Sequence, residues 1–264
     1  MKQSLNNIKG LILDMDGVLW KDTEPIGDLP VIFSKIWKRN LKVMYATNNS
    51  TRDESQYVAK LAGFRIASET TQIITSSNAT ADLLLERFEK GGPLFIIGES
   101  GLRNILLRNG FFYSETSPLA VVVGMDRQVT YDKMSQAALF IRNGSQFFGT
   151  NPDKSFPTPS GQTIGTGAIL AAIAAATGVE PHIAGKPFTR MVEMALKRMQ
   201  LPANEVLVVG DRIETDILSG KNAGCQTALV LSGVTDRESA ERANEADYFF
   251  QDLNEIIDLL GVNG

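Results

Sequence analysis

The sequence predicts an α/β fold in which a doubly wound parallel sheet forms a core domain and a smaller α/β domain is inserted into it. Three observations lead to this prediction. Short, continuous apolar runs recur along the 264 residues, helical patterns lie between them, and the middle of the chain repeats the theme with no acidic cluster after its strands. Continuous apolar runs favour strands covered on both faces. Strand–helix alternation favours a parallel, Rossmann-like sheet.

Four apolar runs define the strands expected in the core domain. They are Gly10–Asp14, Lys42–Thr47, Pro181–Gly185 and Glu205–Asp211. Each run ends at polar residues. Because ligands of open parallel sheets bind beyond the carboxyl ends of the strands, we expect the polar residues after these runs to share one pocket.

Two helices are expected beside these strands. The segment Thr51–Leu61 opens with Thr51-x-x-Glu54, the spacing of a capping box. The segment Pro187–Gln200 has an apolar residue at every helical turn, with Pro187 at the expected first helical position.

The middle of the chain is expected to form the inserted domain, at residues 79–180, which leaves 1–78 and 181–264 as the core. Its expected strands are Pro93–Ile97, Ala120–Val123 and Gln146–Gly149. Its expected helices are Gly101–Asn109, Tyr131–Arg142 and Gly167–Thr177.

Composition excludes several classes of function. The formal charge of −4 and the pI of about 5.2 give no general attraction to nucleic acid or to an anionic membrane. The longest apolar stretch, Ala168–Ala176, is shorter than the ~20 residues that a membrane span needs. A single cysteine, Cys225, cannot form a disulfide framework and fits a reducing cytoplasm, so we expect a cytoplasmic protein.

Asp14 and Asp16 leave the first strand two residues apart, and Gly17 allows a sharp turn directly after them. Like charges this close repel each other, so a cation is needed to keep both ionised. Carboxylate oxygens suit Mg²⁺. A calcium loop is the alternative, but it requires further acidic positions, and here Val-Leu-Trp follows.

Each of the other polar positions also has a purely structural interpretation. Thr47, Asn48 and Asn49 can hold phosphate oxygens at a helix start, or form only a polar turn. Lys186 alone would be read as a surface lysine. Asp216 could be only a helix cap, whereas Asp211 directly follows a buried strand, where an unpaired carboxylate is costly.

Four motifs in this order resemble those of the haloacid-dehalogenase-like (HAD) phosphatases. They are Asp14-Met-Asp-Gly-Val, Thr47-Asn-Asn, Gly185-Lys-Pro and Gly210-Asp-Arg-x-x-Thr-Asp216. The match looks closest to the NagD-like or 4-nitrophenylphosphatase branch (class IIA), whose large cap lies between the second and third motifs. Asn151-Pro-Asp153 and Gly165-Thr-Gly167 also look like the cap of that branch.

The resemblance implies a Mg²⁺-dependent hydrolase of small phosphate monoesters. Asp14 resembles the nucleophile, and Asp16 resembles the general acid/base, which also lends a backbone carbonyl to the metal. Asp211 resembles the main metal ligand of the fourth motif, supported by Asp216. Lys186 resembles the residue that neutralises the nucleophile and the phosphoryl group.

The remaining family roles concern phosphate and substrate. Thr47 and Asn48, with Asn49 beside them, resemble the phosphate cradle. In the expected cap, Asn151, Asp153 and Phe156 are candidate substrate contacts, although for Phe156 a role in packing alone is favoured over contact with substrate.

Two other functions use related residues, and both stay open at this point. A phosphotransferase or mutase on the same scaffold would keep the acyl phosphate until a second hydroxyl arrived. A non-enzymatic phospho-receiver module combines similar residues but is about half as long and has no insertion. The sequence does not identify the phosphorylated metabolite that serves as substrate, and a homodimer is expected only from the resemblance.

Overall fold

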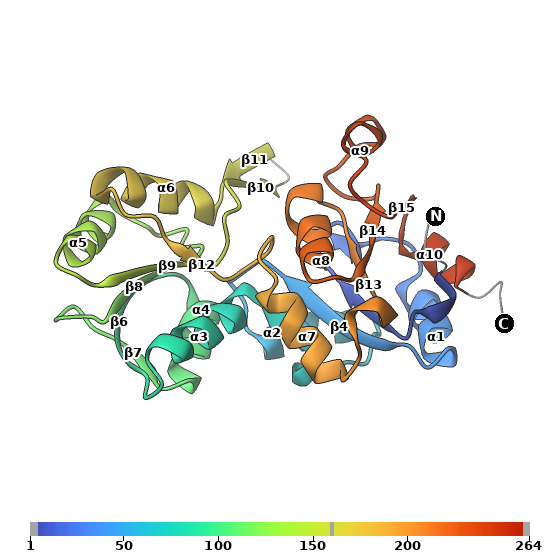
Figure 1. Ribbon diagram of the computed structural model, residues 1–264, viewed down its shortest axis with the longest axis horizontal. Coiled ribbons are helices and arrows are strands. Elements are labelled where there is room, and N and C mark those ends of the chain that lie inside the picture. Colours follow the sequence, from blue (N-terminus) through green and yellow to red (C-terminus); the bar gives the residue numbers. More distant parts are fainter. Residues whose placement is uncertain (1–4, 159–160, 261–264) are drawn as a thin grey trace. The chain divides into compact units, whose positions relative to one another are not determined.

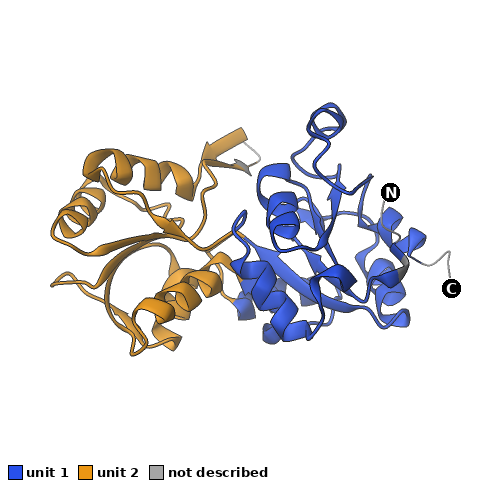
Figure 2. Ribbon diagram, viewed as in Figure 1, with its two compact units in different colours: residues 1–47, 54–74, 186–264 blue, residues 48–53, 75–185 orange. Residues whose placement is uncertain are grey.

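The computed structural model describes residues 5–158 and 161–260 and divides the chain into two compact units (Figure 2). Unit 1 comprises residues 1–47, 54–74 and 186–264, and unit 2 comprises residues 48–53 and 75–185. The boundaries therefore fall near 75 and 185, where the sequence suggested 79 and 180, and a short segment at 48–53 also belongs to unit 2.

Unit 1 is built on a six-stranded sheet with the order β15-β14-β13-β1-β4-β5 (Figure 1). The neighbouring pairs from β15 to β4 are parallel. The strands are β1 (Gly10–Leu13), β4 (Lys42–Thr47), β5 (Ile73–Thr75), β13 (Val206–Gly210), β14 (Gln226–Val230) and β15 (Tyr248–Phe250).

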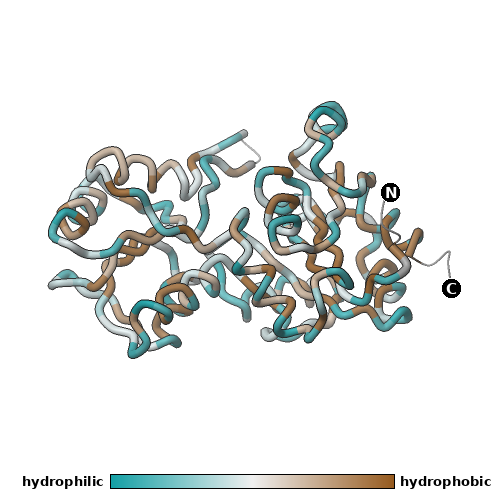
Figure 3. The backbone as a smooth tube through the Cα atoms, viewed as in Figure 1, coloured by the Kyte–Doolittle hydropathy of each residue, from teal (hydrophilic) through white to brown (hydrophobic). Residues whose placement is uncertain are grey.

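Both faces of this sheet are covered, as the continuous apolar runs predict. Leu11 and Ile12 point to opposite faces of β1, yet they are 0% and 1% exposed. In Figure 3 the hydrophobic stretches gather along the strands. The surrounding helices are α1 (Leu29–Lys38), α2 (Glu54–Gly63), α7 (Arg190–Met199), α8 (Leu218–Asn222), α9 (Arg237–Ala243) and α10 (Leu253–Leu259).

Short elements fill the loops of unit 1. After β1 the chain forms a small antiparallel hairpin from β2 (Trp20–Lys21) and β3 (Glu24–Pro25). A single π-helical turn, Ile213–Ile217, follows β13. Single 3₁₀ turns occupy Leu5–Asn7, Thr70–Gln72 and Ala203–Glu205.

Unit 2 contains its own five-stranded parallel sheet, with the order β12-β9-β8-β6-β7. Its strands are β6 (Gly92–Ile97), β7 (Phe111–Tyr113), β8 (Ala120–Val123), β9 (Gln146–Gly149) and β12 (His182–Ile183). Its helices are α3 (Ser76–Arg87), α4 (Ser100–Arg108), α5 (Tyr131–Arg142) and α6 (Thr166–Thr177). An antiparallel hairpin, β10 (Ser155–Thr158) with β11 (Gly161–Ile164), completes the unit.

The structure confirms the α/β class and most of the expected elements, and it corrects three details. The run at 181–185 gives only the two-residue strand β12, which pairs with β9 of unit 2 and is not part of the core sheet. The capping box at Thr51 is wrong, because α2 begins at Glu54 and the Thr51 amide is bonded to Asn49 Oδ1. Pro187 is not a first helical residue, since α7 begins at Arg190 after a turn.

Among residues 5–158 and 161–260, no helix combines the length and apolar character that crossing a membrane requires.

Candidate active site

Asp14 is delivered by the central strand of unit 1. Strand β1 is buried along its whole length, and the Asp14 amide continues its ladder by donating to the Val209 carbonyl at 2.9 Å. The chain then leaves the sheet at its carboxyl edge, where ligands of parallel sheets bind. The Asp14 side chain is only 11% exposed.

Two further carboxylates come from the neighbouring strand β13 and the turn after it. Asp211 directly follows β13, and its Oδ2 accepts a hydrogen bond of 2.7 Å from the Val234 amide. Asp216 lies in the π-helical turn, and its Oδ2 accepts from the Arg212 amide at 3.1 Å. These backbone donors hold both carboxylates in place within the buried site.

The carboxylates of Asp14, Asp211 and Asp216 form one cluster. Each offers an oxygen, and these oxygens lie within 4.8 Å of one another. Asp211 and Asp216 are each 2% exposed. Such a set of buried oxygen ligands fits a hard divalent cation.

Lys186 supplies the positive charge of this cluster. Its Nζ donates to Asp14 Oδ1 at 2.6 Å, to Asp216 Oδ1 at 2.5 Å and to the Ala46 carbonyl at 2.9 Å. The residue is 3% exposed. Three short bonds use all three donors of the ammonium and fix its position.

The burial and the charges perturb the pKa values of the cluster. Burial raises the pKa of Asp14 well above its usual value, because it outweighs the attraction of Lys186, and repulsion from the other two carboxylates adds to it. Burial, followed by repulsion from Asp216, raises the pKa of Asp211 to about 7. For Lys186, burial lowers the pKa, but attraction to Asp14 and Asp216 prevails and the net shift is upward.

The charge balance of the site therefore favours an additional cation. Three ionised carboxylates against one ammonium leave two uncompensated negative charges in a buried place. A divalent ion would neutralise them, and the upward pKa shifts of Asp14 and Asp211 reflect the cost of ionisation without it.

Asp16 has a different environment from the other three carboxylates. It is exposed, and its carboxylate is not part of the cluster that the structure brings together among the described residues. Its Oδ1 accepts a hydrogen bond of 2.8 Å from the indole Nε1 of Trp20. The residue thus stands beside the cluster, on the turn that follows Asp14.

The expected phosphate-binding segment is divided between the two units. Thr47 is the last residue of β4 in unit 1 and is 3% exposed. Asn48 and Asn49 belong to unit 2 by their contacts. Within unit 2, the Asn48 side chain is buried and donates to Asp153 Oδ2 at 3.1 Å, whereas Asn49 is exposed.

The three candidate substrate residues of unit 2 occupy unlike positions. Asn151 is 3% exposed, and its amide donates to the carbonyl of Asn48 at 2.8 Å. Asp153 is half-buried and accepts the bond from Asn48. Phe156 is half-buried on β10. The geometry thus gives Asn151 and Asp153 a structural task, which is to hold Asn48.

Some residues of the site carry no recognisable signal in the sequence. Ser232 donates from Oγ to the Gly17 carbonyl at 2.7 Å, and the Val234 amide binds Asp211. Both lie in the loop after β14. Ser232 acts through its hydroxyl and Val234 through its backbone amide, so their contacts can be identified only in the folded structure. Trp20 was visible only as part of the apolar segment after Gly17.

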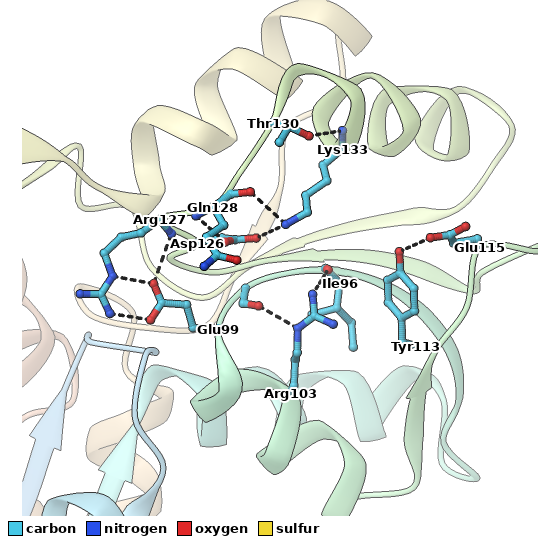
Figure 4. A network of polar contacts seen from close by, with 11 residues as sticks. Ile96, Glu99, Arg103, Tyr113, Glu115, Asp126, Arg127, Gln128, Thr130 and Lys133 are labelled. Carbon is cyan, nitrogen blue, oxygen red and sulfur yellow. Dashed lines mark hydrogen bonds and ion pairs between the residues drawn. The ribbon is translucent and has the colours of Figure 1, made fainter.

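Unit 2 also has a cleft, of about 450 Å³, beyond the ends of β6 and β8. Four of its five charged lining residues form two ion pairs: Arg127 with Glu99 at 2.7 Å, and Lys133 with Asp126 at 3.0 Å (Figure 4). The fifth, Arg103, donates from Nε to the Gly98 carbonyl at 2.8 Å. None of its lining residues belongs to the carboxylate cluster. Because these charges are already satisfied, the network is best explained as one that joins the loops after the two strands.

Comparison with known proteins gives a consistent result. Residues 11–112 match the family model described as haloacid dehalogenase-like hydrolase, and residues 183–256 match a second, HAD-hydrolase-like model. An acid sugar phosphatase of Staphylococcus saprophyticus is 37% identical over 96% of this chain and 98% of its own length. A 5'-nucleotidase of Bacillus subtilis, YutF, is 36% identical over 89% of this chain and 91% of its own length.

Solved structures agree with these relatives. The 4-nitrophenylphosphatase of Thermotoga maritima superposes with a TM-score of 0.92 at 32% identity and covers 97% of this chain and 98% of that one. NagD of E. coli gives 0.85 at 32% identity, with coverages of 94% and 98%.

A glycerol phosphate phosphatase of Mycobacterium tuberculosis, solved in complex with calcium, gives a TM-score of 0.88 at 30% identity and covers 96% of this chain and 75% of that one. HAD phosphatases use a divalent metal, and the carboxylate cluster of this chain is of the kind that holds one. The chain is therefore a member of the haloacid dehalogenase-like hydrolase family, a phosphatase of the type represented by NagD and the 4-nitrophenylphosphatases.

Proposed function

We propose that the chain is a Mg²⁺-dependent phosphatase that hydrolyses small phosphate monoesters through a phospho-aspartate at Asp14, with Asp16 as general acid/base. The observation that supports this best is the ion pair of Asp14 with Lys186, at 2.6 Å, beside the carboxylates of Asp211 and Asp216. A carboxylate held rigidly next to a cation is preorganised to meet a phosphoryl group.

The proposed metal ligands are the carboxylates of Asp14, Asp211 and Asp216, with Asp16 contributing its backbone carbonyl. Mg²⁺ at this place would offset negative charge on the phosphoryl oxygens and on the nucleophile. Lys186 adds a positive charge on the same side, held in place by its three hydrogen bonds.

In the first step, a carboxylate oxygen of Asp14 forms a bond to phosphorus while the bond from phosphorus to the leaving oxygen breaks. Protonated Asp16 gives its proton to that oxygen, and the leaving group departs as an alcohol. In the second step, Asp16 takes a proton from water as the water oxygen attacks phosphorus. The bond between Asp14 and phosphorus breaks, and inorganic phosphate is released.

Unit 2 is proposed as the cap that selects the substrate. Thr47, Asn48 and Asn49 remain the proposed phosphate contacts, and the bond from Asn48 to Asp153 offers a way for unit 2 to orient that segment. Asn151, Asp153 and Phe156 remain candidate substrate contacts. The relatives are named for sugar phosphates and nucleotides, so we propose a small phosphorylated metabolite handled in the cytoplasm, with no nucleic-acid or membrane partner.

The test is release of phosphate from 4-nitrophenyl phosphate by the purified chain, with Mg²⁺ and with chelator. Asp14→Asn should abolish turnover. Asp16→Asn should slow it by about 10²–10⁴-fold, the usual contribution of a positioned acid–base group. Near-normal turnover by Asp14→Asn would refute the mechanism. Transfer of phosphate to added sugars, in preference to water, would instead identify a phosphotransferase.

A further inference from the structure

We infer that Trp20 is a positioning residue for the general acid/base. Its indole N–H holds the carboxyl group of Asp16 in one orientation throughout both steps. The inference rests on the proposed role of Asp16 and adds to it a residue that no motif of the sequence analysis assigned to the site.

The indole of Trp20 contacts the Asp16 side chain directly, and this contact holds the Asp16 side chain in place. Trp20 Nε1 donates to Asp16 Oδ1 at 2.8 Å. Among the described residues, this is the single hydrogen bond or ion pair that the Asp16 side chain makes. Asp16 is exposed, so without this bond its carboxyl group could rotate freely in water.

Trp20 itself is buried and held by two neighbouring side chains. The residue is 0% exposed, and its ring stacks on Phe64 with 5.5 Å between ring centroids and 18° between ring planes. The ammonium of Lys60 lies 4.0 Å from the ring centroid and donates to the Asp22 carbonyl at 3.0 Å. A ring fixed in this way presents its N–H in one direction only.

The backbone brings the two residues together. The Gly17 amide donates to the Trp20 carbonyl at 2.8 Å, and the Trp20 amide donates to the Met15 carbonyl at 3.3 Å. Gly17 has a φ of 86°, in the region that favours glycine, which allows this tight turn. Asp16 and Trp20 therefore face each other across the turn, as a bridge between their backbones also indicates.

The geometry fits a carboxyl group that must change its protonation state twice. The indole N–H occupies Oδ1, which can accept a hydrogen bond whether the group is ionised or protonated on the other oxygen. Oδ2 is left to carry the proton. It gives this proton to the leaving oxygen in the first step and takes one from water in the second, without any rotation of the carboxyl group between the steps.

A purely structural role is the competing explanation, because a buried tryptophan also stabilises the fold. The two roles differ in how they depend on the leaving group. 4-Nitrophenolate is a good leaving group that needs little help from an acid, whereas the alkoxide released from an alkyl phosphate such as glycerol phosphate needs a proton. In the first step, loss of positioning must therefore slow the alkyl substrate more, whereas a general structural defect lowers kcat/KM for both substrates together. The second step is the same for both substrates.

The experiment compares kcat/KM for both substrates, with saturating Mg²⁺, in wild type, Trp20→Phe and Asp16→Asn, because kcat/KM reports the first step, in which the leaving group departs. The control is Trp37→Phe, because Trp37 is 45% exposed on α1 and is the only other tryptophan. We expect Trp20→Phe to lower kcat/KM by about 10–100-fold for the alkyl phosphate and by less than about threefold for 4-nitrophenyl phosphate, part of the range available to acid–base catalysis. Trp37→Phe should leave both rates unchanged.

A second variant removes the N–H with little change in the shape of the ring, in case Trp20→Phe does not fold. In the Trp37→Phe background, position 20 is the single tryptophan, so growth on an analogue with sulfur in place of the indole N–H labels that position alone. The same loss, selective for the alkyl phosphate, is expected. The inference would be overturned if the protein with the sulfur analogue at position 20 and the protein with tryptophan there hydrolysed both substrates at equal rates.

The outcomes also separate this inference from the proposed function. If Asp16→Asn loses little activity on either substrate, the proposed acid–base role fails. If Asp16→Asn lowers kcat/KM selectively for the alkyl phosphate but neither Trp20 variant does so, the proposed function stands and the positioning role is wrong. In the double variant, Trp20→Phe should cause no further loss once Asp16 is Asn, because the two residues act as a unit.

Discussion

Lys186 Nζ lies 2.5 Å from Oδ1 of Asp216, in an ion pair whose two side chains are 4% and 3% exposed. The same nitrogen holds Asp14, so one buried ammonium fixes two of the three clustered carboxylates. Removal of one partner from a buried ion pair leaves the other charge without compensation, and this costs far more than the pair contributes as a whole.

We therefore expect Lys186→Met to lower the free energy of unfolding by about 3–5 kcal/mol in metal-free protein, and to abolish turnover. Urea denaturation at pH 8 measures the first effect. Lys9→Met is the matched control, because Lys9 and its partner Glu205 are 62% and 24% exposed. An exposed pair of this kind should contribute less than about 1 kcal/mol. If both variants lost the same free energy of unfolding, the carboxylates of the site would not depend on Lys186 for charge compensation.

The second prediction concerns pH and follows from Asp211. Its pKa is raised to about 7 in the folded, metal-free protein, against 3.8 as the ordinary value. Between these two values the folded state binds more protons than the unfolded state, so the stability of metal-free protein should fall as the pH rises from about 4 to about 7. Below and above this window, Asp211 adds no slope.

Divalent metal should reverse this trend, because it binds the ionised carboxylates. The increase in Tm on addition of Mg²⁺ should accordingly be larger at pH 8 than at pH 5.5. Asp211→Asn should be more stable than wild type at pH 8 without metal, and it should gain less from Mg²⁺. A Tm shift independent of pH and unchanged in the variant would exclude Asp211 as a ligand.

The clustering of Asp14 and Asp211 was predictable because both residues follow buried strands. Asp14 and Asp211 come directly after β1 and β13, whose continuous apolar sequences mark both the strands and their shared edge. The turn at Pro187 was missed because a proline followed by an amphipathic pattern signals the start of a helix, whereas here the turn precedes Arg190. Strand β12 was misplaced because a two-residue strand does not indicate which sheet it joins.

Other parts of the site could not be predicted from local sequence. The bonds from the Val234 amide to Asp211 and from Ser232 to the Gly17 carbonyl join positions that lie far apart in the chain. A backbone amide carries no sequence signature, since every residue except proline has one. Asn48 directly follows Thr47, the last residue of β4, yet it groups with unit 2, where its carbonyl accepts a hydrogen bond from the Asn151 side chain.

Cys225 offers a third prediction, which concerns the fold alone. The residue is buried, and burial raises the pKa of its thiol to about 12. Thiol reagents attack the thiolate, so native protein at pH 8 should react with Ellman's reagent far more slowly than urea-unfolded protein. A native rate equal to the unfolded rate would contradict the burial of this thiol.

The fourth prediction concerns Gly17, where two features disfavour a side chain. Its φ is 86°, and the space beside its Cα is already filled. A Cβ at this position would collide with the carboxylate of Asp211. Gly17→Ala should therefore both strain the turn and displace a proposed metal ligand. We expect it to weaken Mg²⁺ binding, measured by titration calorimetry, and to lower kcat.

Gly144 provides the matched control for this variant, because it separates backbone strain from steric collision. Its φ is 101°, but a Cβ there would have no atom within 4 Å. Gly144→Ala should cost only the conformational penalty, about 1–2 kcal/mol, and leave Mg²⁺ affinity unchanged. Gly17→Ala could instead lose no more stability than Gly144→Ala and bind Mg²⁺ as tightly as wild type. That result would show that the turn at Gly17 does not constrain Asp211. In that case the tight packing of Gly17 against Asp211 serves only the fold, and the order of the site depends on the Val234 amide instead.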